Sequence, residues 1–144
     1  MRVVLGGLVV LAVLALAACE DSVAPPFVEF EIHVDSVKVV SPYADGDSLR
    51  FYFYALLGPN QCWKFDHFDV GESNNEIVVW LVGHHDLASK RCEIGESRLT
   101  ARRLTLEPHP VGSYQLLVVQ PNQAENITHP FVVAPAGVPV AAPF

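Results

Sequence analysis

The sequence is poor in basic residues and lacks the glycine-rich motifs that bind nucleotides. Its 144 residues include nine Lys and Arg against sixteen Asp and Glu, a formal net charge of −7. A nucleic-acid binder needs clustered cations to displace counterions, and a membrane-surface patch needs a polybasic segment, so neither class is expected. The P-loop and the dinucleotide-binding glycine pattern are both missing, which argues against nucleotide-cofactor enzymes.

Residue patterns for catalysis are also scarce. A serine hydrolase of the Gly-x-Ser-x-Gly type is excluded because that elbow does not occur. Asp66, His67 and Asp69 can be read as an oriented base, and Glu29 and Glu31 as a carboxylate pair, but both patterns are typical of a solvated strand face. We therefore predict a protein that is not an enzyme and needs no cofactor.

Long apolar runs are missing after residue 18. Residues 3–18 form one run of 16 apolar residues, preceded by Met1-Arg2 and followed closely by the charged pair Glu20-Asp21. A transmembrane helix needs about 20 such residues, whereas a short run before a small-residue cut is typical of an export signal. We predict a signal peptide over residues 1–18, which leaves enough chain for one domain.

The end of this run carries a lipidation motif. Leu16-Ala17-Ala18-Cys19 resembles the lipobox of bacterial lipoproteins. The resemblance implies that Cys19 is acylated and becomes the first mature residue, which gives a stable membrane anchor. Because Glu20 and not Asp follows Cys19, the same resemblance favours the outer membrane of a Gram-negative cell envelope, facing the periplasm or the cell surface. Ordinary secretory cleavage and a retained anchor are the alternatives.

The remaining chain has strand signals throughout, and no stretch has a helical apolar stripe. Apolar and polar residues alternate, and turn residues recur at fairly even spacing, which predicts a single all-β sandwich of about seven antiparallel strands over residues 28–133. Residues 19–27 are expected to form a lipidated tether, and residues 134–144 an unpacked Pro/Ala-rich tail. The expected strands are 28–39 with a bulge near Ser36, 49–57, 62–70, 77–82, 99–106, 114–120 and 127–133.

One expected strand carries a family resemblance. The segment Gly112-Ser113-Tyr114 and the apolar residues after it resemble the penultimate strand of immunoglobulin-like and fibronectin-like domains. The resemblance implies that Tyr114 closes a corner of the chain.

Two cysteines remain if Cys19 is acylated. Export places Cys62 and Cys92 in an oxidising compartment, which predicts a disulfide between them. A redox or metal-binding pair is the alternative, but the C-x-x-C spacing is missing. Cys62 and Cys92 also do not occupy the antibody disulfide positions. We therefore expect the bridge at one end of the sandwich, pinning a polar loop over residues 84–97.

That expected loop also holds the densest set of metal-ligand side chains, His84-His85-Asp86. Adjacent residues on a strand point to opposite faces, but a loop relaxes that limit, and Asp66, His67 or Asp69 are available as a further ligand. A polar turn is the alternative reading. We predict no metal site, with His84, His85 and His67 as the candidates for one.

Aromatic residues supply the candidate binding surface. Tyr52 and Tyr54 alternate with the expected core residues Leu49, Phe51, Phe53 and Ala55, and therefore face outward. Trp63 is expected to extend this surface, with Trp80 as a further member, unless the opposing sheet or a loop covers these side chains.

These observations predict a lipid-anchored, non-catalytic binding, adhesion or assembly module of the cell envelope. Its expected partners are the membrane, reached through the anchor, and an envelope protein or glycan. The alternative is an accessory lipoprotein that binds a ligand or metal through the loop at His84–Asp86.

Overall fold

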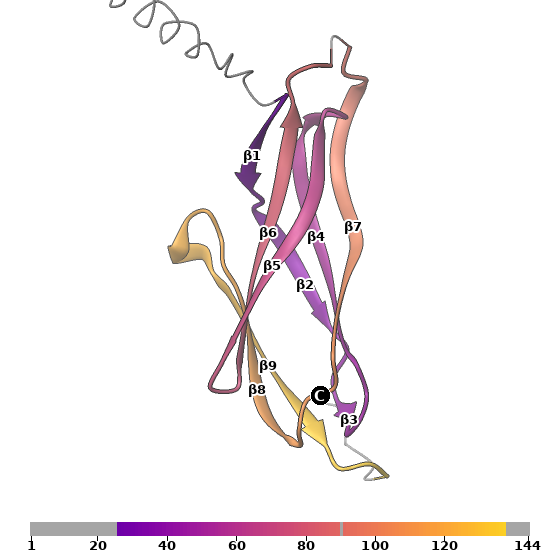
Figure 1. The fold of residues 1–144 in the computed structure, drawn as a ribbon, viewed down its shortest axis with the longest axis vertical. Helices are drawn as coiled ribbons and strands as arrows, with labels where there is room; N and C mark the ends of the chain where they lie inside the picture. The colour runs from indigo at the N-terminus through magenta and orange to yellow at the C-terminus, as the bar shows by residue number, and fades with distance from the viewer. Residues whose placement is uncertain (1–25, 90, 138–144) are drawn as a thin grey trace, which may run out of the picture.

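A computed structural model describes residues 26–89 and 91–137, which fold into two β-sheets (Figure 1). This confirms the predicted all-β fold, with nine strands in place of the seven counted from the sequence. Residues 1–18, Cys19 and residues 138–144 lie outside the described residues. The strands are β1 (Phe27–Glu31), β2 (Val34–Val39), β3 (Tyr43–Ala44), β4 (Leu49–Asn60), β5 (Trp63–Ser73), β6 (Glu76–Asp86), β7 (Ile94–Leu106), β8 (Gly112–Val118) and β9 (Ile127–Ala134), with one short 3-10 helix, η1 (Gln123–Glu125).

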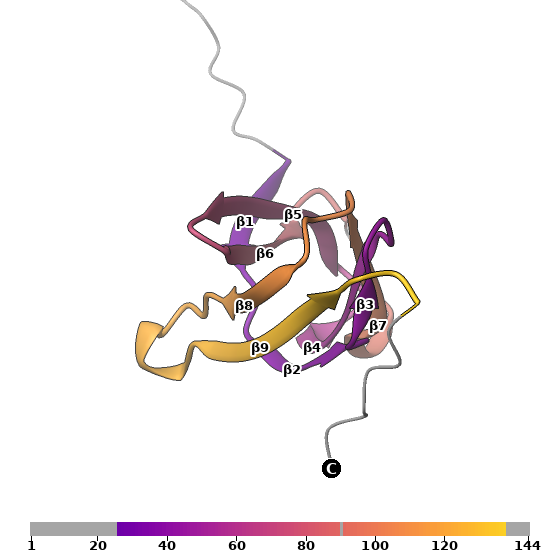
Figure 2. The ribbon, with the colours of Figure 1, turned by 90° about the horizontal axis from the view of Figure 1, so that it is seen from below.

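The two sheets pack face to face around one core (Figure 2). The three-stranded sheet has the order β2-β4-β7, so β4 is its central strand. In the six-stranded sheet, β5 pairs with one edge of β6, and β1 and β8 share the other edge; β9 and β3 follow β8. The pairs β6–β8 and β3–β9 are parallel, and the other pairs in the described chain are antiparallel.

The first expected strand is divided between the two sheets. β1 ends at Glu31 in the six-stranded sheet, and β2 begins at Val34 in the three-stranded sheet. Ile32 and Val34 are both buried in the core, so the apolar alternation continues across the crossing. The register of β2 against β4 shifts between Val34 and Ser36, which confirms the expected bulge.

The core is built from alternate residues of β4 and β6. Leu49, Phe51 and Phe53 are 0 % exposed and Ala55 is 2 % exposed, as predicted from their alternation. Ile77, Val79 and Leu81 of β6 belong to the same buried cluster and complete it from the opposite sheet.

Phe65 and Phe68 of β5 both pack against this core, although a regular strand would turn only one of them inward. A bulge explains this, because the pairing passes from Phe65 opposite Gly83 to His67 opposite Val82 and leaves Asp66 as the extra residue. The two phenylalanine rings lie 4.8 Å apart between centroids.

Several expected turns differ from the structure. Residues 58–60 do not end a strand, since β4 continues through two register shifts to Asn60, which lies opposite Ile94. The turn at 71–75 is reduced to Asn74 and Asn75, whose positive φ angles of 49° and 64° fit a tight two-residue hairpin.

The last strand matches its expected place at an edge. β8 covers one side of β9, and β3 reaches only Val133 and Ala134 on the other side. Among the described residues, Pro130 therefore lies where β9 has a free edge. Ala134 does not begin an unpacked tail, because it pairs with Ala44 and is buried.

Candidate functional site: the two outer sheet faces

The outer face of the three-stranded sheet presents tyrosines among cations. Tyr52 lies opposite Lys38 of β2 on one side and opposite Arg103 of β7 on the other. Tyr54 follows two residues later on the same face. Alternation places the outward residues of this surface, here called the basic face, at Lys38, Arg50, Tyr52, Tyr54, Leu56, Arg98 and Arg103.

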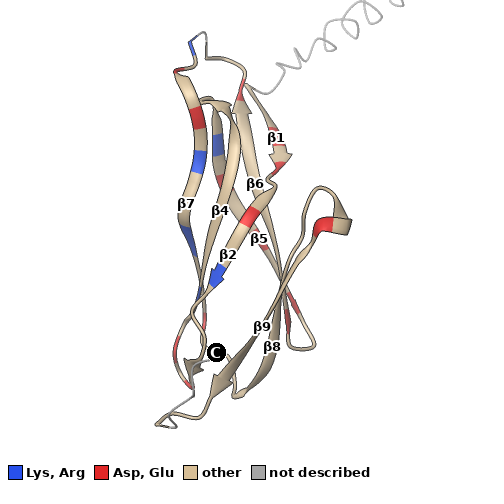
Figure 3. Ribbon diagram, turned by 180° about the vertical axis from the view of Figure 1, so that it is seen from behind, with Lys and Arg blue, Asp and Glu red and all other residues tan. Residues whose placement is uncertain are grey.

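The cations of the basic face are mostly free of acidic partners. Arg98 donates to Glu96 at 2.7 Å, which neutralises one end of the face. Lys38, Arg50 and Arg103 make no salt bridge with any described residue. Figure 3 shows the Lys and Arg bands on β2 and β7. A chain of net charge −7 therefore presents one surface that attracts anions.

Trp63 is not part of this surface, contrary to the expectation from the sequence. It belongs to β5 in the other sheet, and its ring occupies the space that a Cβ on Gly58 of β4 would need. It stacks on His85 at 4.5 Å and contacts Phe30 edge-on at 4.9 Å between centroids. Trp63 thus packs between the sheets, whereas Tyr52 and Tyr54 remain partly exposed.

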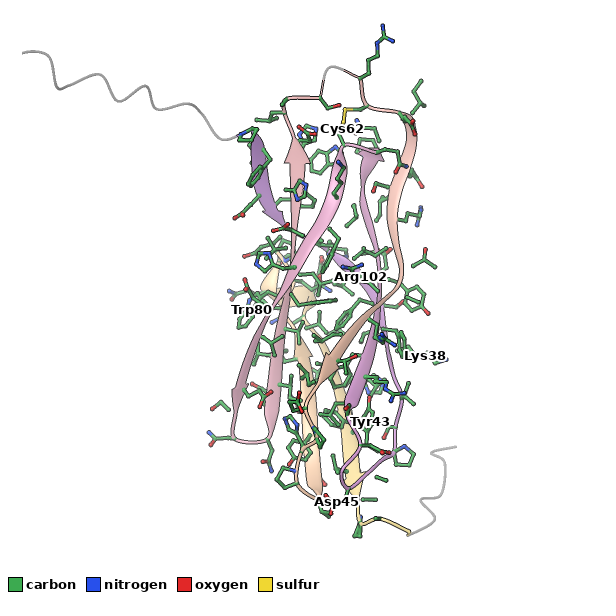
Figure 4. The ribbon with its side chains drawn as sticks, turned by 45° about the vertical axis from the view of Figure 1, so that its right-hand side comes forward. Lys38, Tyr43, Asp45, Cys62, Trp80 and Arg102 are labelled. Carbon is green, nitrogen blue, oxygen red and sulfur yellow. A yellow bond between two sulfur atoms is a disulfide. The ribbon has the colours of Figure 1, made fainter. Side chains whose placement is uncertain are left out.

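The outer face of the six-stranded sheet has the opposite charge. Strands β1, β5 and β6 contain seven Asp and Glu and one Lys, whereas β2, β4 and β7 contain two Asp and Glu and five Lys and Arg. Figure 4 shows Trp80 and Lys38 on opposite sides of the sandwich. The acidic face, as this surface is called here, consists of the outward residues Glu29, Glu31, Asp66, Asp69, Val78, Trp80 and Val82, together with Lys64, His67 and His84.

The predicted bounds of the polar loop that holds His84 and His85, residues 84–97, are wrong at both ends. His84, His85 and Asp86 are the last residues of β6, and β7 already begins at Ile94, so the loop covers only residues 87–93. The polar residues extend the strand because β1 and β5 pair with it on both sides: His84 lies opposite Glu29 and opposite Lys64.

His84 and His85 are consecutive residues of β6, so their side chains point to opposite faces of the sheet. His84 Nδ1 lies 3.5 Å from Asp66 Oδ1 on the acidic face, whereas His85 stacks on Trp63 at the inner side. His67 joins His84 through the same carboxylate, with its Nδ1 2.8 Å from Asp66 Oδ2. His67 and His84 meet at Asp66, but His85 points away from them, and within residues 26–89 and 91–137 no three His, Cys, Asp or Glu side chains are placed to hold a metal ion.

The carboxylates around His67 favour its protonated form. The hydrogen bond to Asp66 raises the pKa of His67 above its ordinary value of 6.5, and the nearby charges of Asp69 and Glu29 act in the same direction. Asp69 Oδ1 lies 3.4 Å from His67 Nε2. Both ring nitrogens therefore face acids, an arrangement that suits an imidazolium better than a metal ligand.

A shallow hollow near the β5–β6 hairpin was not expected from the sequence. Its volume is about 290 Å³, and its lining includes Glu72, Asn74, Asn75, His109 and Tyr114. His109 is largely buried, with Nε2 3.3 Å from Glu72 Oε2 and Nδ1 2.9 Å from the carbonyl oxygen of Glu107. These contacts occupy both ring nitrogens and make His109 a positioning residue for the turn before β8.

Cys62 and Cys92 form a disulfide at one end of the sandwich (Figure 4). The bridge joins the turn between β4 and β5 to the loop 87–93, at one end of the sandwich as expected. Leu87 N in that loop donates to the carbonyl oxygen of Pro26, 2.9 Å away, so the start of β1 lies at the same end.

Comparisons with protein-family models, curated proteins and solved structures gave no significant match to this chain. Within the described residues no helix has the length and apolar character needed to cross a membrane.

Proposed function

We propose that this protein is a lipid-anchored module of the cell envelope that acts by binding rather than by catalysis, and that the basic face is its binding surface. The observation that carries the proposal is the row in which Tyr52 lies between Lys38 and Arg103 on an otherwise acidic protein. Aromatic and arginine side chains are the residues most often responsible for binding energy at interfaces.

The chemistry of the basic face selects an acidic partner. Arg103 and Lys38 offer charged donors to carboxylate or phosphate groups, and the two tyrosine rings offer rigid apolar area that loses little entropy on binding. An envelope protein with an acidic surface or an acidic glycan has the required charge.

The anchor is proposed from the motif Leu16-Ala17-Ala18-Cys19, with the outer membrane as the destination. Intact-mass measurement of the chain purified from membranes tests it: the expected species begins at Cys19 and carries acyl groups. A chain that retains residues 1–18, or begins at Cys19 without acyl mass, contradicts this part of the proposal.

Site-specific photocrosslinking tests the binding surface in intact cells. Benzoylphenylalanine replaces Tyr54 on the basic face or Thr128 on the exposed part of β9 as the control. We expect an adduct of discrete mass from position 54, little from position 128, and loss of the adduct when Lys38→Glu and Arg103→Glu are added. Equal yields at the two positions, or a yield unaffected by the charge reversal, would show that the basic face is not a binding surface.

A further inference from the structure

We infer that the partner of the basic face is the acidic face of a second copy of this chain, so that copies associate side by side with the two kinds of sheet in contact. This inference rests on the proposed binding role of the basic face and names its partner. It is carried by three features of the two faces: matching apolar stripes, opposite charges beside them, and an apolar strand that is covered on one side only.

Both central strands carry an outward apolar stripe of the same length. On β4 the stripe consists of Tyr52, Tyr54 and Leu56, and on β6 it consists of Val78, Trp80 and Val82. Each stripe occupies three successive outward positions, about 13 Å of strand. Stripes of equal length on the middle of two sheets can stack as the inner faces of a sandwich do.

The residues beside the two stripes have opposite charge. Lys38 and Arg103 lie on either side of Tyr52 on the basic face. On the acidic face, Asp69 lies opposite Trp80, and Glu31 lies opposite Val82. Contact between two identical faces would oppose like charges, whereas contact between the two different faces pairs them, so the electrostatics select the mixed arrangement.

The partly exposed apolar residues of β6 support the same contact. Residues 77–82 form an unbroken apolar run, a pattern typical of a strand covered on both faces. Within one copy only the inward set, Ile77, Val79 and Leu81, is buried, and Val78, Trp80 and Val82 remain partly exposed. Tyr52 and Tyr54 of a neighbouring copy would supply the missing cover.

The shape of the molecule suits such contacts on one membrane. β1 begins at the end of the long axis where the disulfide lies, and both outer faces run along the sides (Figures 1 and 4). Neighbours that stack through these sides in the same orientation keep their first strands at the same end. Because the contact joins two different surfaces, it extends into a row or closes into a ring.

Charge reversal and complementation test the inference on the exported full chain carrying Cys19→Ser, in which no acyl group contributes to association. Sedimentation velocity at low salt, up to about 1 mM protein, measures self-association. We expect concentration-dependent oligomers that weaken with added salt. Two double variants reverse the charge of one face each: Lys38→Glu/Arg103→Glu on the basic face and Glu31→Lys/Asp69→Lys on the acidic face. Each should weaken association by more than about tenfold. Arg91→Glu, on the loop 87–93, is the control and should leave association unchanged.

Mixing the two reversed variants gives the decisive measurement. One variant then has two acidic faces and the other two basic faces, so an equimolar mixture should recover association through contacts between unlike variants. The inference is overturned by a parent chain that stays monomeric, by reversed variants that associate like the parent, or by a mixture that does not recover. A photoadduct of position 54 with a different protein also overturns the self-association but leaves the proposed function intact. Equal photoadduct yields at positions 54 and 128 would overturn both the self-association and the proposed binding surface.

Discussion

Tyr114 donates a hydrogen bond from its hydroxyl to the carbonyl oxygen of Pro110, 2.8 Å away and four residues earlier. The bond closes the turn that leads into β8, which is the corner implied by the resemblance to immunoglobulin-like domains. The ring also stacks on Phe131, with centroids 5.5 Å apart, so it is held independently of the hydroxyl.

Tyr114→Phe keeps this ring and removes only the hydrogen bond. We expect the free energy of unfolding to fall by about 1 kcal/mol, measured by urea denaturation. Tyr54→Phe is the matched control, since the Tyr54 hydroxyl makes no hydrogen bond to another described residue, and its stability should not change. Equal stabilities for the two variants would contradict a structural role for the corner.

Gln120 is 1 % exposed, and its side chain forms the two hydrogen bonds with the backbone of Val34 that a neighbouring strand would otherwise form. Val34 N donates to Gln120 Oε1, and Gln120 Nε2 donates to the carbonyl oxygen of Val34, both at 2.9 Å. Gln120→Leu leaves both backbone groups unsatisfied, and we expect a loss of roughly 2–6 kcal/mol by urea denaturation. Gln115→Leu should cost far less, because the exposed Gln115 side chain bonds to Glu76 alone among the described residues.

The Cys62–Cys92 disulfide closes a segment with a sequence separation of 30 residues. Because the bridge restricts the unfolded chain, Cys62→Ala/Cys92→Ala should lower the free energy of unfolding by about 3–4 kcal/mol. The parent chain under reducing conditions should match the double variant in a denaturant melt. A variant as stable as the oxidised parent would show that the bridge contributes nothing.

Gly83 of β6 faces the core where no side chain fits. A Cβ there would lie 2.6 Å from Phe30 Cζ and 2.8 Å from the carbonyl oxygen of Lys64. Gly83→Ala should therefore cost about 1–3 kcal/mol in thermal or urea unfolding. Gly71→Ala is the control, because its nearest neighbour, Trp80, lies 3.7 Å away at ordinary contact distance.

The pKa of His67 should fall when Asp66 loses its charge, because the hydrogen bond to Asp66 is the largest cause of its elevation. NMR titration of the imidazole resonances measures this directly, and we expect Asp66→Asn to lower the pKa of His67 more than Asp69→Asn does. Since folding raises the pKa of His67, protonated His67 stabilises the folded state. This stabilisation is fully present below pH 6.5, and it is lost as the pH rises through the elevated pKa. An unchanged titration in Asp66→Asn would contradict the assignment.

Local pattern was enough to identify the core but not the ends of strands. The alternation of Leu49, Phe51 and Phe53 predicts their burial, because side chains on a strand alternate between its faces. His84 and His85 have polar neighbours and were expected in a loop. They lie in β6 because β1, distant in the sequence, and β5, the hairpin partner of β6, supply hydrogen-bonding partners on both sides.

The candidate surface was likewise only partly predictable. Tyr52 and Tyr54 face outward as their alternation requires, but Trp63 packs inside because β5 lies across the core from Gly58. The role of Gln120 has no sequence signal, since only the crossing of the chain at Ile32 and His33 brings Val34 to it.

By itself, the sequence determined the β-strand periodicity, the residues that face the core and the all-β class, because each of these depends on neighbours within a few positions. Tertiary structure alone decided which strands share a sheet. That choice gathers Lys38, Arg50 and Arg103 on one face and Glu31, Asp66 and Asp69 on the other. Strand pairing is a long-range outcome of packing and hydrogen bonding, so the separation of charge that underlies the proposed binding emerges only when the chain is folded.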